Sequence, residues 1–144
     1  MTNSRVPLGY RIGIDLTEID RFRGLTPDTP FVKRVFSESE ITYCFQNENP
    51  APRLATNFAG KEAVYKALRL DEPLPLDSIE ILRRESGIPY VRLPDSIEFE
   101  VGISLSRTPK YAAAIAMVLD DEHTNFVSTE KLLNDALQDI LPDE

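Results

Sequence analysis

The pattern of apolar and polar positions is most informative over residues 53–68. This stretch follows Pro50 and Pro52 and contains good helix formers with a single glycine, which predicts a helix. At about 100° per residue the helix has two stripes, which are Ala55, Ala59, Glu62 and Lys66 on the first and Leu54, Phe58, Tyr65 and Leu68 on the second. Because apolar residues cover most of its circumference, we expect this helix to lie in the core. Glu62 and Lys66 are then either an exposed ion pair or two charges that need a partner in the interior.

Alternating and continuous apolar patterns elsewhere predict the remaining elements. Strands are expected over residues 9–15, 78–84, 90–93 and 97–106, and a buried strand over the apolar run 111–119. Helices are expected over residues 16–22, from a capping box at 37–40 through about residue 46, and over 129–141. One strand, several helices and then consecutive strands predict an α+β fold, with a mainly antiparallel sheet wrapped around the central helix.

The first predicted strand has two glycines on one of its faces. Tyr10, Ile12 and Ile14 share one face, whereas the opposite face carries two glycines and ends at Asp15. Glycine in a strand permits the close approach of another backbone or of a ligand. A carboxylate at a strand end is commonly a turn former or a helix cap, so Asp15 taken alone does not indicate chemistry.

Length and charge indicate one globular domain with an acidic extension. With 144 residues and 42% hydrophobic content, the chain can bury a substantial core, which we assign to residues 1–119. Eight acidic residues against one lysine give segment 120–144 a charge of −7, and the total of −8 leaves −1 for the rest. A nearly neutral body offers no basic face for nucleic acid, and no apolar run is long enough to span a bilayer.

The single cysteine and the first residues favour a reducing compartment. Cys44 has no partner for an internal disulfide and lies among apolar neighbours, so we expect a buried structural thiol. Residues 1–8 lack the apolar core of a signal peptide, so we expect a cytoplasmic protein.

Three stretches of the chain form a specific combination of motifs. They are GIDLTEIDR at residues 13–21, FAGKEAVYKAL at 58–68, and ISLS at 103–106 followed by KYA at 110–112. Together they resemble the holo-acyl-carrier-protein synthase family of phosphopantetheinyl transferases. The resemblance covers roughly residues 9–119. The combination of these motifs, in this order and at this separation, is more specific than any one of them.

The resemblance implies a magnesium-dependent transfer of the phosphopantetheine arm of coenzyme A to a serine of an acyl carrier protein. It implies that Asp15 and Glu62 are the metal ligands, and that Glu62 and Lys66 are catalytic, with Lys66 on the pyrophosphate. Residues implied to contact coenzyme A are Lys66, Pro89, Arg107 and Thr108. Magnesium prefers hard oxygen ligands, typically one or two carboxylates with water and substrate phosphates, so the residue types fit.

The resemblance also implies an acidic carrier protein that docks on basic residues of the early helix, and a cytoplasmic trimer in fatty acid biosynthesis. Arg21 matches an arginine of the family, whereas Arg23, Lys33 and Arg34 are docking candidates by charge alone. Complementary charge would raise the association rate and make docking weaken with salt.

Three substitutions leave a second interpretation open. Arg107 replaces a histidine that is usual in the family, and it can bind phosphate but cannot act as a base. Asn57 stands where a basic residue is common, and Ile88 replaces a common lysine. These changes suggest fewer contacts with the phosphates of coenzyme A. The alternative is therefore a non-catalytic carrier-protein-binding or nucleotide-binding module with the same fold. A further alternative is a transferase for a polyketide or another dedicated carrier.

Overall fold

The computed structural model describes residues 9–119. The predicted helix over 129–141 and the rest of the acidic segment lie outside the described residues, so the division into a domain and an extension stays a prediction. Within the described part, no helix is both long enough and apolar enough to cross a membrane.

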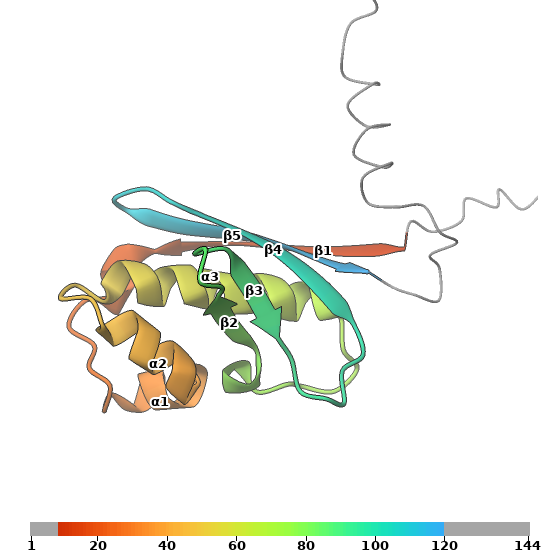
Figure 1. Ribbon diagram of the computed structural model, residues 1–144, viewed down its shortest axis with the longest axis horizontal. Helices are drawn as coiled ribbons and strands as arrows, with labels where there is room; N and C mark the ends of the chain where they lie inside the picture. The colour runs from red at the N-terminus through yellow and green to blue at the C-terminus, as the bar shows by residue number, and fades with distance from the viewer. Residues whose placement is uncertain (1–8, 120–144) are drawn as a thin grey trace, which may run out of the picture.

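The described chain forms five strands and three α-helices, with two short 3-10 helices (Figure 1). The strands are β1 (Tyr10–Glu18), β2 (Glu80–Arg83), β3 (Pro89–Arg92), β4 (Glu100–Arg107) and β5 (Tyr111–Leu119). The helices are η1 (Ile19–Phe22), α1 (Pro30–Val35), α2 (Glu38–Phe45), α3 (Ala51–Leu68) and η2 (Leu76–Ser78).

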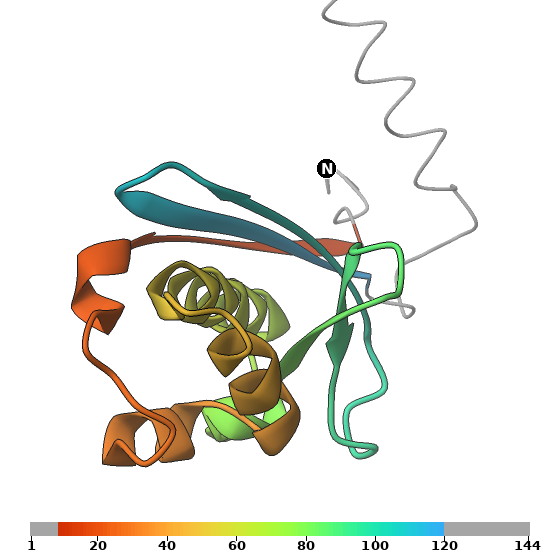
Figure 2. The same ribbon diagram turned by 60° about the vertical axis from the view of Figure 1, so that its left-hand side comes forward.

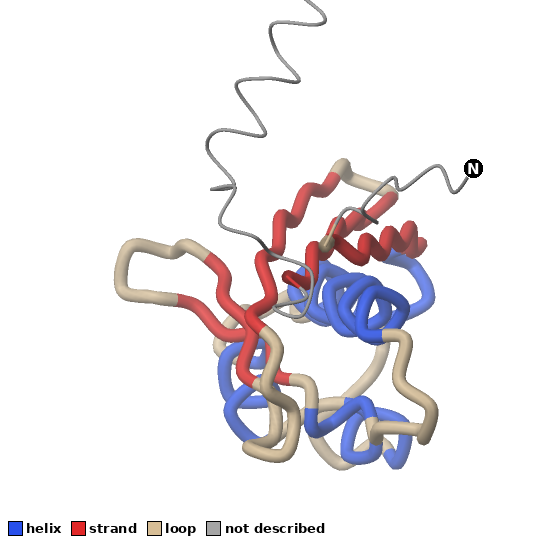
Figure 3. The backbone as a smooth tube through the Cα atoms, turned by 90° about the vertical axis from the view of Figure 1, so that its right-hand side faces the viewer, coloured by secondary structure: helices blue, strands red, loops and turns tan. Residues whose placement is uncertain are grey.

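Two antiparallel sheets enclose α3. One has the strand order β1-β5-β4, and the other is the hairpin β2-β3. The described helices all lie on one face of the three-stranded sheet, with α3 directly beneath it and α1 and α2 below α3 (Figure 2). Figure 3 shows the β2-β3 hairpin projecting away from the helices. The predicted α+β fold with a mainly antiparallel sheet around a central helix is confirmed.

The prediction of a helix over residues 16–22 was wrong in its first half. Residues Leu16 to Glu18 continue β1, because they pair in register with Ala113, Ala112 and Tyr111 of β5. Only η1 is helical, over Ile19–Phe22. Alternation also continues through this stretch, since Leu16 is exposed and Thr17 is buried. A longer window of alternation would have favoured the strand.

Small residues bring α3 close to the sheet. Four alanines spaced four apart on α3 are fully buried, and they are Ala55, Ala59, Ala63 and Ala67. On the sheet, Gly13 faces the helix, and a Cβ added to it would lie 1.9 Å from the carbonyl oxygen of Ala63. Gly13 pairs with the buried Ala116 of β5. The expected close approach at the glycine face of the first strand is therefore present.

The opposite face of the three-stranded sheet is apolar and exposed. Ile12, Ile14 and Leu16 of β1 are 53%, 67% and 68% exposed, and Ile115 of β5 is 46% exposed. Ile14 and Ile115 are direct neighbours in the antiparallel register. We call these four residues the apolar sheet face. No element of the described residues covers it (Figure 2).

The fully buried charge on α3 is Lys61, a residue that the two stripes did not single out. Lys61 and Glu40 of α2 are both 0% exposed and form an ion pair. Burial raises the pKa of Glu40 and lowers the pKa of Lys61, and the charge of each partner opposes the shift of the other. Lys66 and Tyr65, by contrast, are exposed. The buried polar groups of the domain therefore lie where α2, α3 and β2 meet.

Candidate active site

Asp15, Glu62 and Lys66 meet where β1 forms one edge of the three-stranded sheet. Lys66 Nζ donates to Asp15 Oδ1 at 3.2 Å and to the carbonyl oxygen of Ile14 at 3.0 Å. Asp15 Oδ2 accepts a hydrogen bond from Thr17 Oγ1 at 3.0 Å. The side chain of Asp15 is only 14% exposed, whereas that of Lys66 is 52% exposed. The aspartate is therefore held in place, and the lysine borders solvent.

Glu62 and Asp15 are close enough for their charges to interact. Burial first, and the charge of Asp15 second, raise the pKa of Glu62 above its ordinary value, while Lys66 and Arg21 act in the opposite direction. A cation bound between the two carboxylates would stabilise their ionised forms, because it would offset the repulsion between them. The described residues contain no group of three or more potential metal-ligating side chains, so the pair stands by itself.

Local sequence explains why these side chains converge. Asp15 lies two residues after Gly13, and alternate residues of a strand point to the same face, so Asp15 points toward α3. Glu62 and Lys66 are four residues apart and share one face of that helix. The close contact at Gly13 brings the two faces together.

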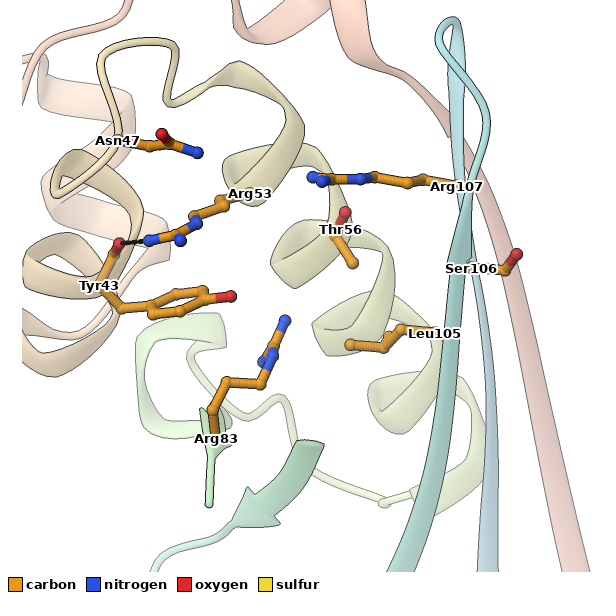
Figure 4. Close-up of a pocket in the computed structure, with 8 residues that line it drawn as sticks. All are labelled: Tyr43, Asn47, Arg53, Thr56, Arg83, Leu105, Ser106 and Arg107. Atoms are coloured by element: carbon orange, nitrogen blue, oxygen red, sulfur yellow. Dashed lines mark hydrogen bonds between the residues drawn. The ribbon is translucent and has the colours of Figure 1, made fainter. Parts of the chain in front are cut away.

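A second feature is a hollow of about 310 Å³ that is rich in arginine, which we call the arginine pocket. Its lining residues are Tyr43, Asn47, Arg53, Thr56, Arg83, Leu105, Ser106 and Arg107. The ring of Tyr43 lies between two guanidinium groups, with Arg53 Cζ 4.4 Å and Arg83 Cζ 4.9 Å from its centroid (Figure 4). Arg107 reaches in from the end of β4, while Ser106 points away.

The arginine pocket carries positive charge without a carboxylate partner. Among the ion pairs of residues 9–119, none includes Arg53, Arg83 or Arg107. Arg53 instead donates to the carbonyl oxygen of Tyr43 at 2.8 Å, and Arg83 donates to Asn57 Oδ1 at 3.0 Å. Guanidinium groups bind phosphate and carboxylate in bidentate fashion, so this arrangement suits an anionic ligand.

The carboxylates and the arginine pocket lie on opposite sides of the chain. Asp15 belongs to β1 and Arg107 to β4, and these strands are the two edges of the sheet. Glu62 follows Arg53 by nine residues, which is about two and a half helical turns, so the two side chains leave opposite faces of α3. The predicted site residues therefore form two groups within one chain.

Two other residues implied to contact coenzyme A lie beside the arginine pocket. Pro89 begins β3 and pairs directly with Arg83. Thr108 begins the β4-β5 turn, where its Oγ1 accepts hydrogen bonds from the backbone of Lys110 and Tyr111. Thr108 and Arg107 also line a neighbouring hollow of about 370 Å³.

The four docking candidates differ in what they contact. Arg21 lies in η1, with its guanidinium 5.9 Å from the ring of Phe58, and it is near enough to influence Glu62. Arg23 pairs with Asp20 at 2.9 Å, and Lys33 pairs with Asp28 at 3.5 Å. Arg34 is exposed on α1. All four are on the surface, as expected.

Sequence reasoning missed the other basic residues of the arginine pocket. Arg53, Arg83 and Tyr43 come from α3, β2 and α2, and no spacing along the chain links them. The only available signal was the strand period, which places Arg83 on the same face as the buried Ile81 and so toward the interior.

Comparisons with known proteins agree on one family. The family model described as the 4'-phosphopantetheinyl transferase superfamily matches residues 11–116. Holo-[acyl-carrier-protein] synthase of Thermodesulfovibrio yellowstonii is 36% identical over 109 residues, covering 74% of this chain and 96% of the relative. The corresponding protein of Chlamydia trachomatis is 39% identical over 117 residues, covering 75% of this chain and 98% of the relative.

Solved structures show the same fold. Helicobacter pylori holo-[acyl-carrier-protein] synthase in complex with coenzyme A is 27% identical with a TM-score of 0.63, covering 74% of this chain and 98% of the other. The Bacillus anthracis synthase in complex with CoA (3',5'-ADP) has a TM-score of 0.67 over 76% of this chain and 96% of the other, and at 24% identity this likeness concerns the fold.

The chain belongs to the 4'-phosphopantetheinyl transferase superfamily. The predicted resemblance is thereby confirmed. Within that superfamily it is an enzyme of the holo-[acyl-carrier-protein] synthase type, as the sequence motifs indicated.

Proposed function

We propose that this chain transfers the 4'-phosphopantetheine arm of coenzyme A to a serine of an apo acyl carrier protein, with magnesium as cofactor. The observation that carries the proposal is the convergence of Asp15, Glu62 and Lys66 at the β1 edge. Family membership and the coenzyme A complex of the Helicobacter pylori relative support the choice of substrate.

The chemistry of Asp15 and Glu62 fits a magnesium ion. Both are hard oxygen donors, and the charge of Asp15 contributes to the raised pKa of Glu62, a repulsion that a divalent cation would relieve. Two carboxylates leave ligand positions for water and substrate phosphate, as magnesium sites in proteins usually do. When bound there, the ion would neutralise the pyrophosphate of coenzyme A and orient it.

The side chains supply the remaining steps. Glu62 accepts the proton of the serine hydroxyl, directly or through a water molecule. The serine oxygen then forms a bond to the phosphorus of the arm as the bond to the 3',5'-ADP phosphate breaks. Lys66 places a positive charge where negative charge develops on the leaving phosphate. Transfer of this kind depends mainly on positioning and charge, so few groups suffice.

The arginine pocket is proposed to bind the nucleotide end of coenzyme A. Its guanidinium groups have no carboxylate partner among the described residues, and a phosphate on the ribose would provide one. Arg107 serves here as a phosphate ligand, because arginine stays protonated and cannot act as a base. Pro89 and Thr108 lie at the rim of the same region.

A trimer with active sites between subunits would join the two groups of residues. The carboxylates and the arginine pocket lie on opposite sides of the chain, so the arginine pocket of one subunit would serve the carboxylates of another. The apolar sheet face gives such an assembly a surface to bury. The proposal includes docking of an acidic carrier protein on Arg21 and the neighbouring Arg23, Lys33 and Arg34, a cytoplasmic location and a role in fatty acid biosynthesis.

The proposal is tested by incubating the protein with an apo carrier protein, coenzyme A and magnesium, and measuring the added arm by mass spectrometry. Transfer that requires magnesium is expected. Absence of transfer with several carriers, including one encoded in the same genome, would contradict the proposal and favour the non-catalytic module.

Glu62→Gln is expected to abolish transfer while leaving the fold intact. The amide keeps the shape of the side chain but loses the charge needed to hold magnesium and to accept a proton. Single-turnover transfer and the melting temperature are the two measurements. Full transfer by this variant would rule out the assigned metal site. Glu98→Gln, at an exposed position before β4, serves as the matched control.

A further inference from the structure

We propose that Arg83 of β2 supplies the charge by which this chain selects the phosphorylated ribose of coenzyme A, and that the buried Asn57 of α3 is the positioning residue that orients it. This proposal rests on the proposed function, because it takes the nucleotide end of coenzyme A as the ligand of the arginine pocket.

The amide of Asn57 has only one arrangement that satisfies its neighbours. Asn57 is 0% exposed, so it has no contact with solvent or with a ligand in the pocket. Its Nδ2 donates to Glu40 Oε2 and to the carbonyl oxygen of Ile81, each at 3.2 Å. Both partners are acceptors, which fixes the nitrogen on that side. Oδ1 therefore points the other way, where it accepts from Arg83 at 3.0 Å.

Glu40 in turn fixes Asn57. Its Oε1 accepts from the backbone of Ser37 and from Lys61 Nζ, and its Oε2 accepts from Asn57 and from the backbone of Ile81. A carboxylate with four donors has little freedom to rotate, and no buried side-chain polar atom of the described residues lacks a partner. The chain of contacts from Glu40 to Arg83 is thus set by the folded core.

The other contacts of Arg83 leave donors free for a ligand. Its Nη1 donates to the carbonyl oxygen of Leu82 at 3.3 Å, and its Cζ lies over the ring of Tyr43, 4.9 Å from the centroid. A guanidinium group has five N–H donors, so the hydrogen bonds to Asn57 and Leu82 leave three donors for a ligand in the pocket that Arg83 lines. A charge that is already oriented loses less conformational entropy when it binds, and it can approach phosphate in bidentate fashion.

Arg84 provides a matched control for this assignment. It is the next residue in the chain and carries the same charge, but its guanidinium lies over Tyr90 at 4.9 Å and does not line the arginine pocket. An effect of total charge would appear in both variants, whereas an effect of the oriented group would appear only in Arg83 variants.

The test compares the dissociation constants of coenzyme A and dephospho-coenzyme A, which lacks the ribose phosphate, for the full chain by isothermal titration calorimetry. The wild-type protein is expected to prefer coenzyme A. Arg83→Ala is expected to weaken coenzyme A binding about tenfold to a hundredfold and to leave dephospho-coenzyme A nearly unchanged. Arg83→Lys should restore part of the preference, and Arg84→Ala should leave it unaltered. An unaltered preference in Arg83→Ala would overturn the proposal.

Asn57 is tested through the same preference. Asn57→Ala should reduce it, and should have no further effect when Arg83 is already alanine, because a residue that acts through Arg83 has nothing left to orient. A purely structural role would weaken both ligands equally and would contradict the proposal. If Asn57→Ala does not fold, Asn57→Ser is used, because its hydroxyl can still donate to Glu40 whereas the amide oxygen that contacts Arg83 is gone. A reduced preference supports the assignment, and an unchanged preference contradicts it.

The outcomes separate this inference from the proposed function. If the wild-type protein transfers the arm and Arg83→Ala keeps the full preference, the inference fails and the function stands. If the wild-type protein binds neither ligand, the proposed function fails.

Discussion

Gly13 determines how closely β1 approaches α3, and through that distance the position of Asp15. A Cβ at residue 13 would lie 1.9 Å from the carbonyl oxygen of Ala63 and 2.9 Å from the nitrogen of Ala67. Both are backbone atoms, so no side-chain rotation can relieve the contact. Asp15 lies two residues further along the same face and bonds to Lys66.

Gly13→Ala should therefore lower both stability and activity. Overpacking of this kind typically costs about 1–3 kcal/mol, and separation of β1 from α3 would move Asp15 away from Glu62. Urea unfolding and the transfer assay measure the two effects. Gly102→Ala is the control, because the nearest atom to its added Cβ is 4.0 Å away. Equal stability of the two variants would show that the close approach is unimportant.

Cys44 should be unreactive in the folded protein. Burial, followed by the charge of Glu40, raises the pKa of its thiol from 9.0 to about 12. The neutral thiol is thus favoured by folding, and this contribution is full below pH 9 and is lost as the pH rises toward 12. Between these values the free energy of unfolding should fall by about 1.4 kcal/mol per pH unit relative to Cys44→Ala. Alkylation at pH 8 only after addition of denaturant would agree, and rapid alkylation without it would not.

At the scale of elements, most of the fold follows from local pattern. The strand over 111–119 and the capping box at Ser37 and Glu40 appear where the apolar run and the cap chemistry place them. The expectation that this strand is buried was wrong for one of its faces, because Tyr111 and Ile115 are exposed on the side away from the helices. The helix over 16–18 does not form, because pairing with β5 outweighs local preference.

The candidate site divides in the same way. Motifs identify Asp15, Glu62 and Lys66 because each motif keeps its residues in one element. Arg53 and Arg83 escaped notice because only tertiary packing brings them to one ring, that of Tyr43. For the same reason, the expectation that Asn57 reduces the contacts to phosphate did not consider Arg83, which lies beside it in the fold.

Ser37→Ala should destabilise the start of α2. Its Oγ accepts from the backbone of Glu40 at 3.3 Å and donates to Glu80 Oε2 at 2.8 Å, which joins the helix to β2. Loss of an N-cap typically costs about 1 kcal/mol, and the lost contact with Glu80 adds to it. Chemical denaturation should show about 1–2 kcal/mol of destabilisation. Ser39→Ala, at an exposed position in the same first turn, should lie within about 0.5 kcal/mol of the wild type.

For the whole molecule, the apolar sheet face is the feature with the largest consequence for assembly. Four large aliphatic side chains lie exposed on adjacent strands β1 and β5, on the side away from the helices. An exposed patch of this kind usually marks an interaction surface. Since the carboxylates and arginines also lie on opposite sides of one chain, assembly and activity should be linked.

Ile14→Lys is expected to weaken the proposed trimer and to reduce transfer with it. A charge at the centre of the apolar sheet face is tolerated in a monomer, where residue 14 is exposed, but is costly in a buried interface. Sedimentation velocity and the dependence of specific activity on protein concentration report the effect. Ser96→Lys, at an exposed position in the turn before β4, is the control. A fully active monomer in either variant would argue against shared active sites.

Glu40 links the fold in a way that bears on how the chain unfolds. Its carboxylate receives donors from the first turn of α2, from α3 and from β2. If α3 separated from α2, the carboxylate of Glu40 would lose its donors Asn57 and Lys61. It would then be stable only if water entered the interior to replace them. Partly ordered forms are therefore disfavoured over a wide range of conditions, and these three segments are expected to melt as a single cooperative unit.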